Sequence, residues 1–166
     1  MSRFAKTAAI VLAAGSLAAL PATALAQTQQ MQLLQSVSTQ DVELAMSRIG
    51  GQAVLEGAGE NGSPTMRLTF ANGIVASAQF ACNQTQGCTG INLIAYFPPA
   101  ETMSVEQGLL KVRRFNANFA AASAGLDVQN NLYVRRYLIF DNGITDQNLL
   151  VNLRVFESMC AQFKEA

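Results

Sequence analysis

The stretch that decides the fold is residues 66–97, MRLTFANGIVASAQFACNQTQGCTGINLIAYF, in which two turn-forming runs separate three apolar runs. In the first run, over 66–70, apolar side chains alternate with polar ones, which is typical of a strand with one buried face. Asn72-Gly73 follows and favours a two-residue hairpin turn, because both of its central positions take a positive φ. We therefore predict an antiparallel meander whose second and third strands cover 74–82 and 88–97.

A helix and a short strand precede this meander. Thr39 is expected to cap the helix and Gly50-Gly51 to end it. Its apolar stripe, at steps of four and three residues, consists of Val42, Met46 and Ile49. A strand then begins at Ala53 and stops at the glycine-rich turn 57–62.

A second helix, a second hairpin and a third helix follow the meander. Ser104 and Gln107 form the capping-box pattern of a helix whose apolar side is lined by Val105, Leu109, Val112 and Phe115. The hairpin pairs 117–126 with 132–140. Thr145 is expected to cap the last helix, in which the apolar residues again recur at steps of four and three: Leu149, Leu153, Phe156, Cys160 and Phe163.

The resulting order of elements is α-β-β-β-β-α-β-β-α, with the strands joined mainly by hairpins. This order predicts an α+β domain over residues 39–166. We expect an antiparallel sheet of about six strands, with helices packed on one of its faces.

Residues 1–26 have the pattern of a secretory signal peptide. A cationic start is followed by an apolar run and by the small-x-small cleavage site Ala24-Leu25-Ala26. Cleavage before Gln27 leaves residues 27–38 as an N-terminal segment ahead of the domain, and it leaves no membrane anchor. We therefore expect a periplasmic or secreted protein.

Cys82 and Cys88 flank a turn-forming loop between two predicted strands, so the hairpin brings them together. In an exported protein this favours a structural disulfide. One alternative is metal binding, for which only Cys160 remains as a further soft ligand. The other is a redox-active pair, although such pairs are more often C-x-x-C at a helix N-terminus. Ile91, Leu93 and Phe97 place Cys88 on the opposite face of its strand, so the disulfide needs a β-bulge or a local twist. Cys160 is expected to be a buried, unpaired thiol.

The composition of the 166-residue chain excludes several functions. Without histidine there is no Ser-His or Cys-His dyad and no ordinary catalytic zinc site. Eleven basic and 11 acidic residues give a net charge of zero, which removes the electrostatic footprint of a nucleic-acid-binding protein. Asp127, Asp141 and Asp146 lie at turns or at a helix start, where carboxylates bond backbone amides. We expect no enzyme, no catalytic residues, no cofactor and no metal.

Two arginine pairs, Arg113-Arg114 and Arg135-Arg136, raise the alternative of an anion-binding site. Adjacent residues of a strand point to opposite faces, so Arg135 and Arg136 cannot form one patch. Arg113 and Arg114 fall in the last turn of a predicted helix, where cations suit the helix dipole. We therefore favour structural roles for both pairs.

The central hairpin, FACNQTQGCTGINLIAYF over residues 80–97, resembles that of the YbjN family, described as bacterial sensory transduction regulators. Residues 112–116, VRRFN, are similar to the V-N-x-W-N helix end of that family, with arginine and phenylalanine where asparagine and tryptophan are usual. Residues 141–145, DNGIT, are similar to its G-G-[VI]-[ST] closing segment. The resemblance spans about residues 40–164.

This resemblance implies an α+β fold similar to type III secretion chaperones and a non-enzymatic regulatory role. We therefore expect an exported module that acts by protein–protein contact, with a protein partner or a second copy of itself on an uncovered face of the sheet. The alternative is a small-molecule-binding protein or a small enzyme of the bacterial envelope. That alternative predicts a pocket between the sheet and the helices, near Tyr96, Tyr133 and Tyr137.

Overall fold

The computed structural model describes residues 33–59, 62–99 and 102–165. The predicted signal peptide and its cleavage site lie outside the described residues, and so does half of the predicted N-terminal segment 27–38. None of the helices in the described part of the chain is both long enough and apolar enough to cross a membrane.

Six antiparallel strands form one sheet in the order β2-β3-β4-β5-β7-β6. The strands are β2 (Gln52–Ala58), β3 (Pro64–Thr69), β4 (Val75–Asn83), β5 (Gly87–Phe97), β6 (Ser123–Leu126) and β7 (Leu132–Ile139). The helices are α1 (Thr39–Arg48), α2 (Val105–Asn118) and α3 (Asp146–Glu165). The predicted α+β class and the order of elements are confirmed.

Two further strands, β1 (Leu33–Leu34) and β8 (Ile144–Thr145), pair with each other in a separate antiparallel ladder. Each is only two residues long, so neither leaves a periodic signal in the sequence.

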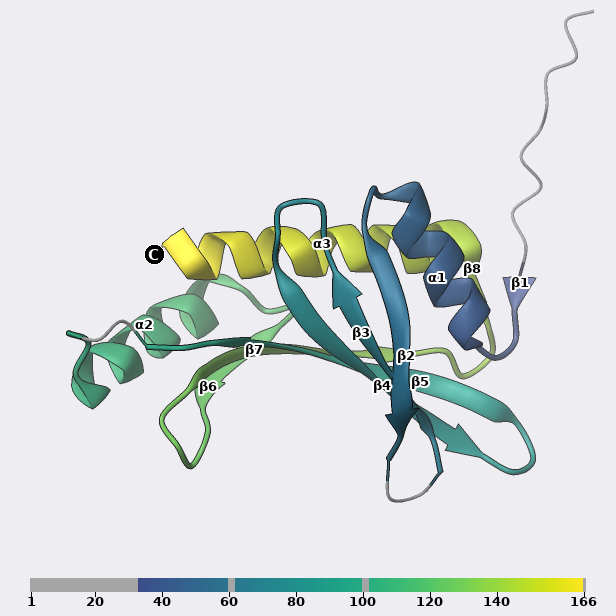
Figure 1. The fold of residues 1–166 in the computed structure, drawn as a ribbon, viewed down its shortest axis with the longest axis horizontal. Coiled ribbons are helices and arrows are strands. Elements are labelled where there is room, and N and C mark those ends of the chain that lie inside the picture. Colours follow the sequence, from purple (N-terminus) through teal and green to yellow (C-terminus); the bar gives the residue numbers. More distant parts are fainter. Residues whose placement is uncertain (1–32, 60–61, 100–101, 166) are drawn as a thin grey trace, which may run out of the picture.

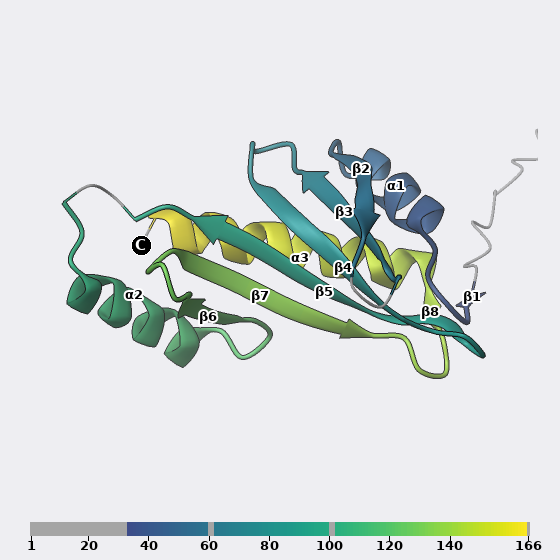
Figure 2. The same ribbon diagram turned by 60° about the horizontal axis from the view of Figure 1, so that its bottom comes forward.

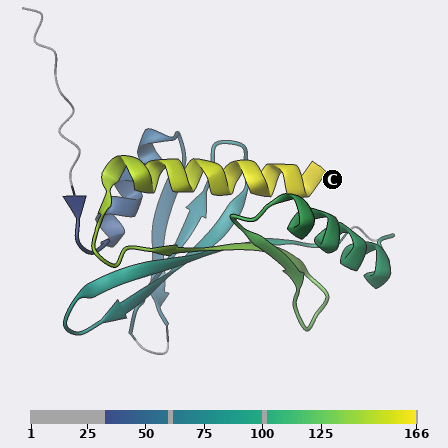
Figure 3. The same ribbon diagram turned by 180° about the vertical axis from the view of Figure 1, so that it is seen from behind.

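The helices lie mainly on one side of the sheet (Figure 1). α3 runs across this side over β5 and β7, while α1 lies on the same side against β2 and beside α3. α2 lies at the end of the sheet next to β6. The opposite side of the sheet, which faces downward in Figure 3, carries no helix of the described chain. One face of the sheet is therefore covered and the other is open.

The covered side contains the hydrophobic core. The strands contribute Met66, Leu68, Ala78, Phe80, Ile91, Leu93, Ala95, Val134 and Leu138. All five apolar residues predicted on the last helix are at most 1% exposed: Leu149, Leu153, Phe156, Cys160 and Phe163. The predicted periodicities of the meander and of the last helix are thus confirmed.

The N-terminal cap of α1 differs from the prediction. Ser38, not Thr39, is the capping residue: its side chain accepts a hydrogen bond from the backbone N–H of Asp41. The Asp41 carboxylate in turn accepts from the backbone N–H of Ser38 at 2.8 Å. This reciprocal capping box selects Ser38, because only that residue stands three positions before an acidic side chain that can complete it.

The end of α2 also differs. The helix begins with the predicted capping box but continues to Asn118, so that β6 starts at Ser123 instead of residue 117. The backbone N–H of Phe119 donates to the Phe115 carbonyl, and the two rings pack with their centroids 4.7 Å apart. These contacts stabilise an extra turn that strand propensity alone does not predict.

The buried side of α2 is only partly the predicted one. Val112 and Phe115 are buried, but Val105 and Leu109 are 50% and 43% exposed. Gly108 takes the remaining buried position, next to Leu126 of β6 and Leu132 of β7. The helix therefore contacts the sheet edge along a narrower stripe than its apolar pattern indicates.

The turn between β3 and β4 is a three-residue loop instead of the predicted two-residue turn. The backbone N–H of Gly73 donates to the Phe70 carbonyl at 2.9 Å, and the N–H of Phe70 donates to the Ile74 carbonyl. Only Gly73 has a positive φ, and the Asn72 side chain accepts from the N–H of Ile74. The loop fits the common three-residue hairpin in which a glycine forms the bulge.

The β-bulge that the disulfide requires lies in β5. Ala81 pairs with Gly90 and Cys82 pairs with Cys88, so that Thr89 is the extra residue. The bulge reverses the parity of the strand, and the structure joins Cys82 to Cys88 in a disulfide. Two carbonyl groups at the bulge bond other segments. That of Cys88 accepts from the backbone N–H of Val37, and that of Thr89 accepts from the backbone N–H of Phe140.

Thiol reactivity tests this arrangement. Burial raises the pKa of the Cys160 thiol to about 12, so at pH 8 almost none of it is the reactive thiolate. We expect a thiol-specific reagent at pH 8 to label no cysteine of the native protein. It should label one cysteine after unfolding, and all three only after reduction. Labelling of more than one cysteine before reduction would contradict the disulfide.

Candidate functional site

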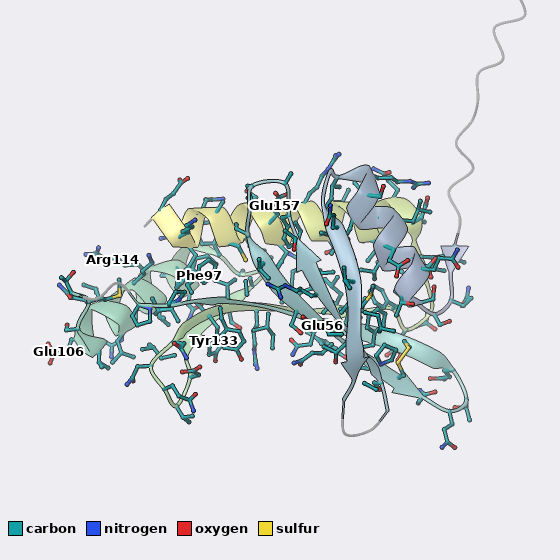
Figure 4. All side chains as sticks on the ribbon, viewed as in Figure 1. Glu56, Phe97, Glu106, Arg114, Tyr133 and Glu157 are labelled. Atoms are coloured by element: carbon teal, nitrogen blue, oxygen red, sulfur yellow. A yellow bond between two sulfur atoms is a disulfide. The ribbon has the colours of Figure 1, made fainter. Side chains whose placement is uncertain are left out.

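The candidate site is the uncovered face of the six-stranded sheet, here called the open face. Its residues alternate along the strands with the buried ones and point away from α1 and α3. They are Val54, Arg67, Val75, Ser77, Gln79, Asn92, Ile94, Tyr96, Tyr133, Arg135, Tyr137 and Ile139. Figure 4 shows Phe97 on the side of α3 and Tyr133 on the opposite side.

The open face exposes large apolar and aromatic side chains. Val75, Tyr137, Tyr96, Val54 and Ile139 are between 41% and 66% exposed. They belong to four different strands, so the exposed apolar side chains extend across the sheet from β2 to β7. Contiguous exposed apolar surface on a folded domain marks an interaction site.

The side chains of two tyrosines on the open face lie flat on the sheet, each over a neighbouring strand. The Tyr137 phenol lies over Gly90 of β5, and the Tyr133 phenol lies over Gly125 of β6. A Cβ at either glycine would overlap the phenol, so the glycines make room for the rings. Tyr96 packs against Tyr133 with ring centroids 6.1 Å apart. The three rings thus form a broad aromatic surface on β5 and β7.

The predicted pocket between sheet and helices near these tyrosines is wrong. Tyr96, Tyr133 and Tyr137 all lie on the open face, on the side of the sheet away from α3. The positions that do face the helices are occupied by the buried Ala95, Val134 and Leu138. The sequence pattern showed that the tyrosines alternate with these residues, but not which set the helices cover.

The two arginines of β7 point to opposite faces of the sheet, as predicted. Arg135 is on the open face between Tyr133 and Tyr137. Arg136 is on the helix side, where it donates a hydrogen bond to Asn152 of α3. Its second terminal nitrogen, Nη1, is buried without a hydrogen-bond partner in the described chain, and desolvation lowers the pKa of this guanidinium. Arg113 and Arg114 lie apart from both, on α2. The prediction that they fall in its last turn is wrong, because the helix continues to Asn118 and its last turn has no basic residue.

The charges of the open face are few. Glu56 of β2 lies 3.9 Å from Arg67 of β3, and both side chains are about half exposed. Arg135 has no ion-pair partner among the described residues. Gln79 and Asn92 bond each other through their side-chain amides at 3.2 Å. The part of the face around Arg135 is therefore cationic and otherwise neutral.

A side chain of α2 bonds the backbone of β6 at one edge of the sheet. Figure 2 shows β2 and β6 at opposite edges, with α2 beside β6. The Asn116 side-chain amide of α2 accepts from the backbone N–H of Ala124 at 2.7 Å and donates to its carbonyl at 3.0 Å. It thereby satisfies a free edge position of β6, which would otherwise pair with another strand. Asn116 belongs to the 112–116 run compared above with the YbjN helix end, and its role here is structural.

A polar recess lies beside the disulfide hairpin. It has a volume of about 460 Å³ and is lined by Gln35, Gln86, Thr89, Asp141 and Asn142. Within the described ranges, no group of three or more cysteine and carboxylate side chains is placed to hold a metal ion. The recess carries no charged pair suited to acid–base chemistry, so we assign it no role in the site.

Replacing Asn116 tests its role at the sheet edge. Asn116→Ala should lower the free energy of unfolding by about 1–3 kcal/mol, because it leaves two backbone groups of Ala124 without their partners. The Ala124 amide should also exchange faster with solvent. Asn118→Ala is the matched control, since Asn118 bonds only the Arg114 carbonyl at the exposed helix end. Urea unfolding and hydrogen exchange give the two readouts, and equal effects of both variants would contradict the edge role.

Comparisons with known proteins locate this architecture in a family. Among curated proteins, none matches the chain in sequence. One similar solved structure, "Structure of the HopA1-SchA Chaperone-Effector Complex", has 13% sequence identity and a TM-score of 0.49. That similarity covers 78% of this chain and 99% of the other.

The model of the YbjN family, "Putative bacterial sensory transduction regulator", matches residues 83–166. The match contains β5, α2, β6, β7 and α3, and with them the tyrosines and Arg135 of the open face. The predicted resemblance is thereby confirmed over this half of the chain, and the protein belongs to the YbjN family.

Proposed function

We propose that this protein is an exported regulatory module that acts by binding another protein on the open face of its sheet. The observation that carries the proposal is the exposure of Tyr96, Tyr137 and Ile139 on a face that no helix of the described chain covers. The description of the YbjN family as regulators supports the same role.

The size of the open face favours a protein partner over a small ligand. From Tyr133 to Ile139 the strand rises about 20 Å, at roughly 3.3 Å per residue. From β2 to β7 the face spans four strand spacings, which is about 19 Å. An area of this size accommodates one amphipathic helix or an extended segment of a partner. Small ligands, by contrast, bind in concave sites that enclose most of their surface.

The composition of the face agrees with a binding role. Tyrosine and arginine are the residue types that most often dominate the energy of protein interfaces. The Tyr133 and Tyr137 rings lie over glycines against the sheet, so part of their side-chain freedom is already lost before binding.

Export is the second part of the proposal. It is supported by the signal-peptide pattern of residues 1–26 and by the disulfide between Cys82 and Cys88. Disulfides persist in oxidising compartments such as the periplasm and are rare in the cytosol. A binding module in the envelope would act by occupying or releasing a partner protein, without chemistry of its own.

The mass of the protein isolated from the envelope fraction tests export. We expect a chain that begins at Gln27 and is lighter by about two daltons than its reduced form, because the disulfide removes two hydrogens. Reduction and alkylation under denaturing conditions provide the control for the two-dalton difference. A full-length reduced chain found in the cytosol would contradict export.

Site-specific photo-crosslinking in the native host tests the binding face. A photoreactive phenylalanine analogue at Tyr137, which is 54% exposed on the open face, should crosslink to a defined partner protein. The same analogue at Val151, which is 46% exposed on α3, is the matched control and should not. Identification of the crosslinked peptides by mass spectrometry gives the readout. Crosslinks from Val151 alone would place the partner on the helix side and overturn the proposal.

A further inference from the structure

We infer that the partner segment bound by the open face is acidic and amphipathic, with one carboxylate that pairs with Arg135 between the rings of Tyr133 and Tyr137. This inference rests on the proposed function and specifies the chemistry of its partner. The charge distribution and the dimensions of the open face carry it.

Arg135 occupies a central place in the aromatic part of the face. Tyr133 and Tyr137 stand two residues before and after it on β7, so all three side chains project on the same side at intervals of about 7 Å. Across the sheet, Arg135 pairs in register with Ile94 of β5 and with Ser123 of β6. Its neighbours along β7 and in register are therefore two rings, an aliphatic side chain and a hydroxyl, and none of them is an acid.

Arg135 differs from the other arginine of the open face in its charged neighbours. The other arginine of the face, Arg67, already has Glu56 at 3.9 Å. Arg135 is exposed and has no carboxylate within salt-bridge distance among the described residues. Glu56 lies on β2, four strand spacings from β7, so its charge is about 19 Å away across the sheet. An incoming carboxylate would thus meet an unpaired cation and no nearby like charge.

The surroundings of Arg135 make such a pair effective once a partner covers it. An exposed ion pair contributes little because water screens it. The apolar part of a bound segment would exclude water from the pair, and charge-assisted bonds strengthen in that environment. A planar guanidinium binds a carboxylate with two parallel hydrogen bonds, which a lysine could not do.

The dimensions of the face define the rest of the segment. Apolar or aromatic side chains lie on both sides of Arg135: Tyr137 and Ile139 toward one end of β7, Tyr133 and Tyr96 toward the other. The length of about 20 Å corresponds to a helix of about 13 residues at 1.5 Å per residue. We take the segment to be an amphipathic helix, in which apolar residues one turn before and after a central Asp or Glu meet the side chains on both sides of Arg135.

A selection from a library of random 14-residue peptides tests this inference. The bait is the disulfide-bonded protein without residues 1–26, as wild type, as Arg135→Gln and as Arg114→Gln. Arg114 is the matched control, because it is an exposed arginine on α2 and outside the open face (Figure 4). Equal thermal unfolding midpoints of the three forms show that the fold is unchanged.

We expect the wild type and Arg114→Gln to enrich peptides with Asp or Glu between apolar residues, and Arg135→Gln to lose this enrichment. For the best acidic peptide, Arg135→Gln should weaken binding about tenfold or more, as is typical when one member of a covered charge pair is removed. Replacing Glu by Gln in the peptide should weaken its binding to the wild type by a similar factor. Arg135→Glu should instead enrich Lys and Arg at the central position.

Enrichment without acidic residues, or enrichment unchanged by Arg135→Gln, would overturn the inference. So would an equal loss with Arg114→Gln, because that would show a general effect of net charge. A homodimer that Arg135→Gln dissociates would show that a second copy of the chain supplies the carboxylate, and would replace the inferred partner. The peptide experiment measures charge preference and the Tyr137 crosslink measures the native occupant, so failure of one is distinguishable from failure of the other.

Discussion

The packing of α3 onto one face of the sheet is the interaction on which the rest of the structure depends. Its buried residues, from Leu149 to Phe163, cover the inner positions of the central strands. Because side chains alternate along a strand, burial of Val134 and Leu138 forces Tyr133, Arg135 and Tyr137 to the opposite face. The packing of the core therefore determines which residues lie on the open face. A shift of one residue in strand register would exchange the buried and the exposed side chains.

The bulge at Thr89 resolves a conflict between the core and the disulfide. Ile91 and Leu93 must face α3, whereas Cys88 must meet Cys82 at the end of the hairpin. One extra residue satisfies both requirements. The carbonyl groups of Cys88 and Thr89 then accept hydrogen bonds from Val37 and from Phe140, respectively. The disulfide hairpin is therefore tied to the segment that leads into α1 and to the one that leads into α3.

The β6 edge of the sheet lies beside the aromatic part of the open face. At β6 the Asn116 amide binds both backbone groups of Ala124, so that this edge is closed to a further strand. α2 adds the bulk that covers the same edge (Figure 2). The aromatic and cationic residues of the open face lie next to this closed edge, on β5 and β7. A partner held there would bind through side chains, with geometry fixed by a rigid sheet.

The sequence by itself determined the elements whose periodicity is local. The alternation at Met66, Leu68 and Phe70 and the stripe of α3 are visible without a structure, because periods of two and of about 3.6 residues follow from backbone geometry. The Cys82–Cys88 proximity and the opposite orientations of Arg135 and Arg136 follow from the same reasoning. The α+β class and the antiparallel sheet follow from the order of these elements, and the family resemblance implies the same class of fold.

The face of the sheet that the helices cover, and with it the location of the three tyrosines, depends on tertiary contacts. Alternation defines two sets of side chains, but the choice between them depends on α3, which follows β7 in the chain and crosses over the sheet. The extension of α2 to Asn118 and the Asn116–Ala124 bonds depend in the same way on contacts between separate elements. Local patterns show which residues of a segment can be buried. Which other segment buries them depends on contacts between elements that are far apart in the sequence.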